Sequence, residues 1–203
     1  MAPIPLEIPD YITQLYQDPQ RHYHNLDHIN HMLSLIPTDH PNGRELTYAT
    51  WFHDCAYDPQ AKHGVNETES MQHWEKHVEE RGEELSDIKE IVCLMIDCTI
   101  THTVPSASPV LVQNETKTHL VQRFLDMDMD ILASQRDDYL EYTRKVRREY
   151  GYFTDEDFRK GRAKFLRSEL KKERLFYLDE NEGKNEIARQ NMRAELAMLE
   201  ECL

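Results

Sequence analysis

The chain has 203 residues, of which 39% are hydrophobic and 31% are charged, a balance that suits a globular protein with one sizeable core. The 38 acidic and 24 basic residues give a formal charge of −14, which disfavours binding to a nucleic-acid polymer or to an anionic membrane surface. No apolar run is long enough for a membrane-spanning helix, and the first residues lack the features of a signal peptide, so we expect a cytoplasmic protein. The four cysteines have no metal-binding spacing and are expected to be reduced.

Apolar residues recur at spacings of three and four almost throughout, and no strand-like alternation extends over five residues. This pattern predicts an all-α fold. No break is long enough for a linker, so the prediction is a single domain over residues 1–203, with a core for a metal site at about 21–150. Three helix starts are predicted from a capping side chain followed by acidic residues, at Asn66, Ser134 and Thr154. The predicted helices cover residues 10–18, 24–36, 45–56, 66–81, 86–100, 112–132, 135–150, 155–178 and 184–200.

The first candidate residues for chemistry lie near the start of the second predicted helix. His24 and His28 are four residues apart, so on a helix they share one face and can serve one site. The alternative is a polar helix end whose histidines meet solvent.

A second candidate pair follows in the third predicted helix. Leu46, Ala49 and Thr50 precede His53 at helical spacings, which places His53 on the inward face. Asp54 lies about 100° further round the helix, where it can bind the same cation as His53. The alternative is a core histidine beside an aspartate that is paired with a lysine or an arginine.

Three aspartates alternate with methionines near residue 128. On a helix, Asp128 interrupts an otherwise apolar stripe over residues 121–132, whereas Asp126 and Asp130 fall on other faces and are predicted to be solvated. A carboxylate on an apolar face requires a cation or several hydrogen-bond donors. Asp128 is therefore a candidate metal ligand.

Two histidines and two aspartates from three helices would form a mixed nitrogen and oxygen ligand set. Such a set suits one divalent ion, with Mn, Co, Fe, Ni, Mg and Zn all compatible, and it leaves coordination positions open. A cation of this kind can polarise a phosphate oxygen and acidify water. We therefore expect one divalent metal ion as cofactor and a small phosphorylated substrate.

At these residues the chain resembles the HD superfamily of metal-dependent phosphohydrolases, whose signature is a histidine, a His-Asp pair and a distant aspartate. It is more similar still to a group of predicted HD-superfamily phosphohydrolases. The shared blocks are Arg-x-Tyr-His-Asn-Leu-x-His-Ile at 21–29, Trp-Phe-His-Asp at 51–54, Asn-Glu at 66–67 and Phe-Leu-Asp-x-Asp at 124–128. The resemblance implies an HD-type helical bundle whose metal ligands are His28, His53, Asp54 and Asp128.

The segment around His24 is also similar to the corresponding segment of cyclic-nucleotide phosphodiesterases, in which the first histidine protonates the leaving oxygen. This similarity implies that His24 is a catalytic acid. Asp54 counts as both a ligand and a catalytic residue. Glu67 is a candidate base or water-positioning residue, the alternative being an ordinary glutamate in the first turn of a helix.

Further residues are candidates for contact with substrate. His102 could contact phosphate or a second metal, or could be a surface histidine at a helix end, and His63 is a second candidate for an extra metal, although we expect one metal. Arg21 is a candidate for substrate binding. The basic run Arg144–Arg148 is either a solvated helix face or part of an anion site.

The leading hypothesis is a metal-dependent phosphohydrolase that cleaves a phosphate ester of a nucleotide or a small phosphorylated metabolite. One alternative is an iron-dependent oxygenase on an HD-like scaffold. Another is a non-catalytic ligand-sensing protein with a structural metal. The charged helices over 155–200 are expected to serve packing or subunit contact, which is compatible with a homo-oligomer.

Overall fold

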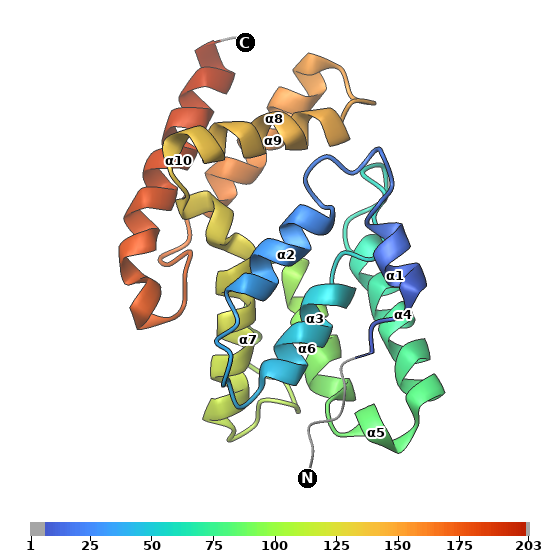
Figure 1. Cartoon of the computed structure of the whole chain (residues 1–203). Helices are drawn as coiled ribbons and strands as arrows, with labels where there is room; N and C mark the ends of the chain where they lie inside the picture. Colours follow the sequence, from blue (N-terminus) through green and yellow to red (C-terminus); the bar gives the residue numbers. More distant parts are fainter. Residues whose placement is uncertain (1–6, 202–203) are drawn as a thin grey trace. The chain divides into compact units, whose positions relative to one another are not determined.

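The computed structural model describes residues 7–201. Over this range every regular element is a helix and no strand occurs, which confirms the predicted all-α fold (Figure 1). The described residues divide into two compact units, the first ending at Phe124 and the second beginning at Leu125. A single domain over the whole chain therefore stays a prediction. Between residues 7 and 201, no helix combines the length and the apolar character needed to cross a membrane.

From residue 7 onward, the first unit contains six complete helices and the start of a seventh. Its helix α6 packs against both α3 and α4, and α2 packs against α3. The stripe at 88, 91, 92, 95 and 96 is buried, as its spacing predicts. The helices are α1 (Asp10–Leu15), α2 (Leu26–Ser34), α3 (Gly43–Phe52), α4 (Val65–Arg81), α5 (Glu83–Ser86), α6 (Lys89–Thr99) and α7 (Glu115–Asp128), within which the division between the units falls.

In the second unit, α10 packs against α9 and against the short helix η1 (Figure 1). Its core includes Tyr139, Leu166, Phe176 and Met192, none more than 1% exposed. The start of α9 follows its prediction, because the Thr154 hydroxyl accepts a hydrogen bond at 3.1 Å from the backbone N–H of Asp157, the third residue of the helix. The elements are η1 (Met129–Ala133), α8 (Arg136–Glu149), α9 (Asp155–Glu169), η2 (Asp179–Asn181) and α10 (Glu182–Glu201).

The helix predicted over 155–178 ends at Glu169, and side chains from α10 explain the difference. The side-chain oxygen of Asn185 accepts hydrogen bonds from two consecutive backbone N–H groups of the following segment, at 2.7 and 3.1 Å. The guanidinium of Arg189 donates to three carbonyl oxygens just after the helix end. Because these partners satisfy the backbone, the segment can be buried without being helical.

Two predicted helix caps are wrong. The N-cap of α4 is Gly64, with a φ of 82°, and Asn66 instead bonds through its side chain to the backbone N–H and carbonyl of Asp58 at 3.0 and 3.1 Å. The N-cap of α8 is Gln135, not Ser134. The predicted helix 112–132 also divides into α7 and η1. The contacts of Asn66 with the loop at Asp58 explain the first difference, and the tighter turns of η1 explain the last.

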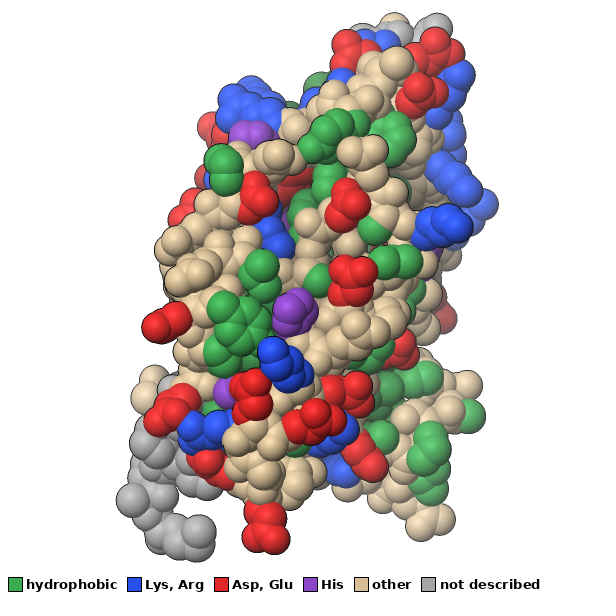
Figure 2. Space-filling model, turned by 90° about the vertical axis from the view of Figure 1, so that its right-hand side faces the viewer, with side chains coloured by type: hydrophobic (Ala, Val, Ile, Leu, Met, Phe, Trp, Pro, Cys, Tyr) green, Lys and Arg blue, Asp and Glu red, His purple; other side chains and the backbone are tan. Residues whose placement is uncertain are grey.

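Charged side chains are spread widely over the surface. Figure 2 shows acidic and basic side chains mixed across the face that it draws, with hydrophobic side chains scattered among them. Three cysteines within the described range are free: Cys55 and Cys98 are buried, and Cys93 is half-buried. Burial raises the pKa of both Cys55 and Cys98 to about 12, so these thiols stay protonated at neutral pH. Cys202 lies outside the described residues.

Candidate metal centre

Three of the predicted ligands converge in the first unit. The Nε2 atoms of His28 and His53 lie 3.3 Å apart, and Asp54 Oδ2 lies 3.0 Å from His53 Nε2 and 3.9 Å from His28 Nε2. One candidate ligand atom from each residue lies within 4.8 Å of the other two. The histidines are 5% and 1% exposed, whereas Asp54 is half-buried. The arrangement thus combines a buried pair of nitrogens with a carboxylate that reaches toward solvent.

Asn25 positions the first of these histidines. Its side-chain oxygen accepts a hydrogen bond from the N–H of Asp27 at 2.9 Å, which caps α2, and its amide donates to the carbonyls of Arg21 and His22. The same side chain therefore closes the preceding turn and starts the helix. His28 consequently lies in the first turn of α2.

His24 does not share a helical face with His28 as predicted, because α2 begins after it, at Leu26. The two imidazole centroids nevertheless lie 6.1 Å apart. The ring of His24 stacks on Tyr57 at 4.5 Å and meets the edge of Tyr23 at 4.9 Å. The rings of Tyr23 and Tyr57 therefore hold half-buried His24 close to His28, a candidate ligand.

The end of α3 positions His53 and Asp54. The helix ends at Phe52 rather than near residue 56, so His53 is its C-cap and Asp54 lies in the turn that follows. His53 Nδ1 lies 2.9 Å from the Thr50 carbonyl oxygen, and a carbonyl can only accept, so Nδ1 carries the hydrogen. In a neutral ring the lone pair is then on Nε2, the atom that faces His28 and Asp54.

The donor set fits a divalent cation. Two imidazole nitrogens at 3.3 Å need a proton or a cation between them, and a carboxylate oxygen lies next to both. Two nitrogens and one oxygen suit Zn²⁺, Fe²⁺, Co²⁺ or Mn²⁺. Asp128 belongs to the second unit and is half-buried, and its role as a fourth ligand stays a prediction.

Arg21 supports the turn that carries Asp54. Its guanidinium donates to the backbone carbonyls of Asp54 and Cys55 at 2.6 and 2.7 Å, and the residue is only 8% exposed. The guanidinium also lies over the rings of Tyr16 and Tyr57, at 5.0 and 5.4 Å. The structure thus gives Arg21 a positioning role that the sequence did not indicate, while its direct contact with substrate stays a prediction.

Tyr16 holds the same region from another side, because its hydroxyl donates to the carbonyl of Trp51 at 3.0 Å. The last turn of a helix leaves carbonyl oxygens without helical partners. Here Tyr16 and His53 each take one of them. Neither Tyr16 nor Tyr57 was predicted as part of the site, since no local pattern marks a contact that spans more than thirty residues.

Glu67, the candidate base, is half-buried in the first turn of α4. Ser70 lies three residues later on the same face, and its hydroxyl accepts a hydrogen bond from the N–H of Ala56 at 3.1 Å. This face of α4 therefore adjoins the loop that follows α3, although the group of three ligand atoms does not include Glu67. His102 follows α6 with a φ of 48°, and His63 is exposed before α4. The roles of all three candidates stay predictions.

The prediction for Asp126 is wrong, because this residue is 2% exposed rather than solvated. Burial raises the pKa of its carboxyl, although three hydrogen bonds favour the charged form. Asp130 is likewise predicted to be solvated, but it is half-buried, and its Oδ1 atom lies 2.5 Å from Lys184 Nζ. A helical projection identifies the widest apolar face of the segment, but it does not show that polar residues on another face are also buried against distant parts of the chain. The donors to Asp126 are the N–H groups of Tyr177 and Leu178, at 2.6 and 3.0 Å, and the side-chain amide of Asn181, at 2.7 Å.

The fold and the site define an all-helical protein with a candidate divalent-metal centre in its first unit. No protein-family model, curated protein or solved structure matches the chain. The similarity to HD phosphohydrolases therefore depends on the four sequence blocks, and membership of that superfamily remains a hypothesis.

Proposed function

We propose that the protein is a metal-dependent phosphohydrolase of the HD type that acts in the cytoplasm. Its substrate would be a phosphate ester of a nucleotide or of another small phosphorylated metabolite. The observation that carries the proposal is the convergence of His28, His53 and Asp54 on one small volume. The four sequence blocks support the same chemistry.

One divalent ion would be held by His28, His53 and Asp54, with Asp128 as the proposed fourth ligand. Such an ion supplies Lewis acidity to a phosphate ester. The hydrogen bond from His53 Nδ1 to the Thr50 carbonyl would fix the orientation of the ligand ring. The carboxylate of Asp54 would balance part of the positive charge.

Three residues that are not in the proposed ligand set are assigned supporting roles in the reaction. The imidazole centroid of His24 lies 6.1 Å from that of His28. An imidazole at this position can donate a proton to the departing oxygen of the ester. Glu67 is proposed to orient the attacking water, since its face of α4 adjoins the loop after Asp54. Arg21 would act as a positioning residue through its bonds to the backbone of that loop.

The test begins with protein freed of metal and reloaded separately with Mn²⁺, Co²⁺, Fe²⁺, Mg²⁺ or Zn²⁺. Bound metal is measured by elemental analysis, and phosphate release is measured over a panel of nucleotides and sugar phosphates. Asp54→Ala should lose both bound metal and phosphate release. The matched control is Asp97→Ala, which removes an exposed carboxylate from α6 of the same unit and should keep both.

Full metal content and turnover in Asp54→Ala would contradict the proposal. Iron-dependent consumption of O₂ without phosphate release would favour the oxygenase hypothesis. Stable metal binding without either activity would favour a ligand-sensing protein. Asp128→Ala tests the fourth ligand, because it should weaken metal binding without abolishing it, and an unchanged affinity would remove Asp128 from the ligand set.

A further inference from the structure

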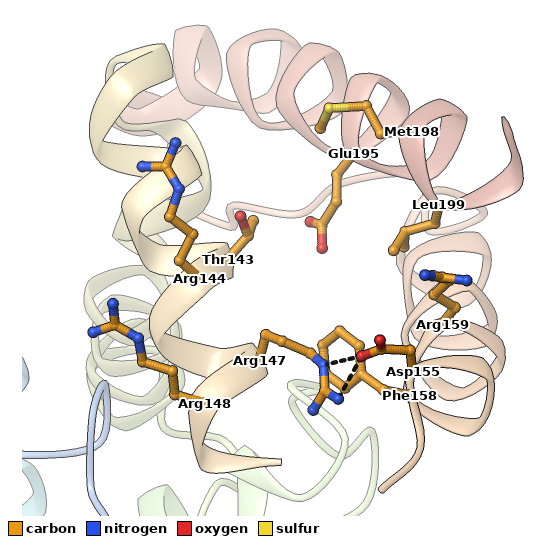
Figure 3. A pocket seen from close by; sticks show the side chains of 10 residues that line it. All are labelled: Thr143, Arg144, Arg147, Arg148, Asp155, Phe158, Arg159, Glu195, Met198 and Leu199. Atoms are coloured by element: carbon orange, nitrogen blue, oxygen red, sulfur yellow. Dashed lines mark hydrogen bonds and ion pairs between the residues drawn. The ribbon is translucent and has the colours of Figure 1, made fainter. Parts of the chain in front are cut away.

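A cleft of about 510 Å³ lies among α8, α9 and α10 of the second unit (Figure 3). This volume lies within the range of small-molecule binding sites. The lining shares no residue with the candidate metal centre and combines basic with apolar side chains. Its main members are Arg144, Arg147, Arg148, Arg159, Phe158 and Met198.

Two carboxylates also line the cleft, but each has its own arginine. Arg147 Nη2 lies 2.7 Å from the carboxylate of Asp155, and the hydrogen bonds from Arg147 lower the pKa of Asp155 (Figure 3). Glu195 accepts from Arg162 Nε at 2.7 Å, in an ion pair whose side chains are less than 10% exposed. Each of these two acids is therefore paired with an arginine other than Arg144 and Arg148, and Asp155 also interacts electrostatically with Arg159.

Arg144 and Arg148 are two of the four arginines that line the cleft, and neither is paired with Asp155 or Glu195. They lie four residues apart on α8 and both line the cleft, but Figure 3 shows their side chains extending from the side of the helix that faces away from Glu195, Met198 and Leu199. Among residues 7–201, the guanidinium of Arg148 has no hydrogen-bond or ion-pair partner, although the backbone carbonyl of this residue accepts from the N–H of Gly151 at 3.0 Å. Arg144 pairs with Glu141 at 3.2 Å in an exposed contact, and such a contact is worth at most about 1 kcal/mol. Since neither guanidinium is held by a buried partner, both can turn from the positions in Figure 3 toward an anion at the α8 edge of the cleft.

Apolar side chains complete the cleft. Met198 is 43% exposed, and its neighbour Leu199 is half-buried. The guanidinium carbon of Arg147 lies 4.9 Å from the centroid of the Phe158 ring and covers one face of it. An inorganic ion would leave this apolar surface in water, whereas an organic group would cover it. Two neighbouring arginines also match the several oxygens and the double charge of a phosphate better than a single carboxylate.

We propose that this cleft binds a small organic phosphate, with the phosphate held by Arg144 and Arg148 and the organic group packed against Met198 and Leu199. The site is independent of the proposed hydrolase centre, because its binding needs neither metal nor turnover. In a protein with a formal charge of −14, a local excess of arginines would select an anion that the rest of the surface repels.

The experiment is a calorimetric titration of the full chain with phenylphosphonate, which carries a phosphonate and a ring and cannot be hydrolysed as an ester. EDTA and low salt are present throughout. The double variant Arg144→Gln/Arg148→Gln should bind about 10-fold more weakly or worse, because it loses charge-assisted hydrogen bonds. The matched control is Arg136→Gln/Arg167→Gln, which removes the same charge from exposed positions of α8 and α9 and should change the affinity by less than about 2-fold.

A second arm tests the apolar half of the site. Met198→Ser should weaken the binding of phenylphosphonate and leave the binding of inorganic phosphate unchanged. Helix content, measured by circular dichroism, should be the same in all variants, since the changed side chains are exposed. The proposal would be overturned by the absence of saturable binding, by an unchanged affinity in Arg144→Gln/Arg148→Gln, or by an equal loss in the two double variants.

Discussion

Replacing Arg21 by methionine should destabilise the first unit and weaken metal binding together. Methionine keeps most of the length of the side chain but removes every hydrogen-bond donor. The two short bonds to the carbonyls of Asp54 and Cys55 would be lost, and so would the contacts with the rings of Tyr16 and Tyr57. The turn that presents Asp54 would then lack its main side-chain support.

The expected loss follows from the two charged hydrogen bonds. Each bond to a charged group contributes about 1.5–3 kcal/mol, and removing the guanidinium leaves two buried carbonyl oxygens without this partner. The free energy of unfolding should therefore fall by roughly 3–5 kcal/mol, allowing for partial access of water. For a chain of this size, that loss lowers the melting temperature by about 6–20 °C.

The assay pairs thermal unfolding in EDTA with a calorimetric Co²⁺ titration below the melting temperature. The control is Arg44→Met in the same unit. Arg44 donates to both carboxylate oxygens of Asp87, at 2.7 and 2.6 Å, but the side chain of that aspartate is 66% exposed. Loss of such an exposed pair should cost at most about 1 kcal/mol and leave Co²⁺ binding unchanged.

The positioning role of Arg21 would be refuted if Arg21→Met melted within about 2 °C of the unchanged protein, since that shift corresponds to less than about 1 kcal/mol. A large loss of stability with unchanged Co²⁺ affinity would separate the two effects. In that case Arg21 would support the fold but not the geometry of the ligands.

Three further predictions concern stability. Trp74→Ala should lower the free energy of unfolding by about 3–5 kcal/mol in urea titrations, because the indole is fully buried and a cavity would remain. Asp126→Ala should cost about 3 kcal/mol by the same measurement, since it leaves the N–H groups of Tyr177 and Leu178 buried without their acceptor, and a change below about 1 kcal/mol would contradict this. Burial lowers the pKa of His77 below its usual 6.5, so the folded state disfavours the charged ring. The stability that depends on neutral His77 should be complete above pH 6.5 and fall as the pH drops through the lowered pKa, and His77→Gln should flatten this slope in urea midpoints measured from pH 8 to pH 5.

Much of the helical framework can be derived from local sequence. The three- and four-residue spacing of apolar side chains predicts the helices, because a helical backbone places such residues on one face whatever else the chain does. The inward position of His53 follows from the same spacing, and the cap at Thr154 follows from chemistry between neighbouring residues. Residue types and a family resemblance predict a ligand set of His28, His53, Asp54 and Asp128. The geometry brings the first three together, and the place of Asp128 in the set stays a prediction.

Long-range hydrogen bonds settled what local patterns left open. The chain leaves its helix after Glu169 because Asn185 and Arg189 satisfy the backbone there. Asp126 is buried because donors more than fifty residues away surround its carboxylate, and Arg21 faces the turn at Asp54 for a similar reason. A periodic pattern records which face of a helix avoids water, but it holds no information about which distant backbone group will meet a polar side chain. That information exists only once the chain has folded.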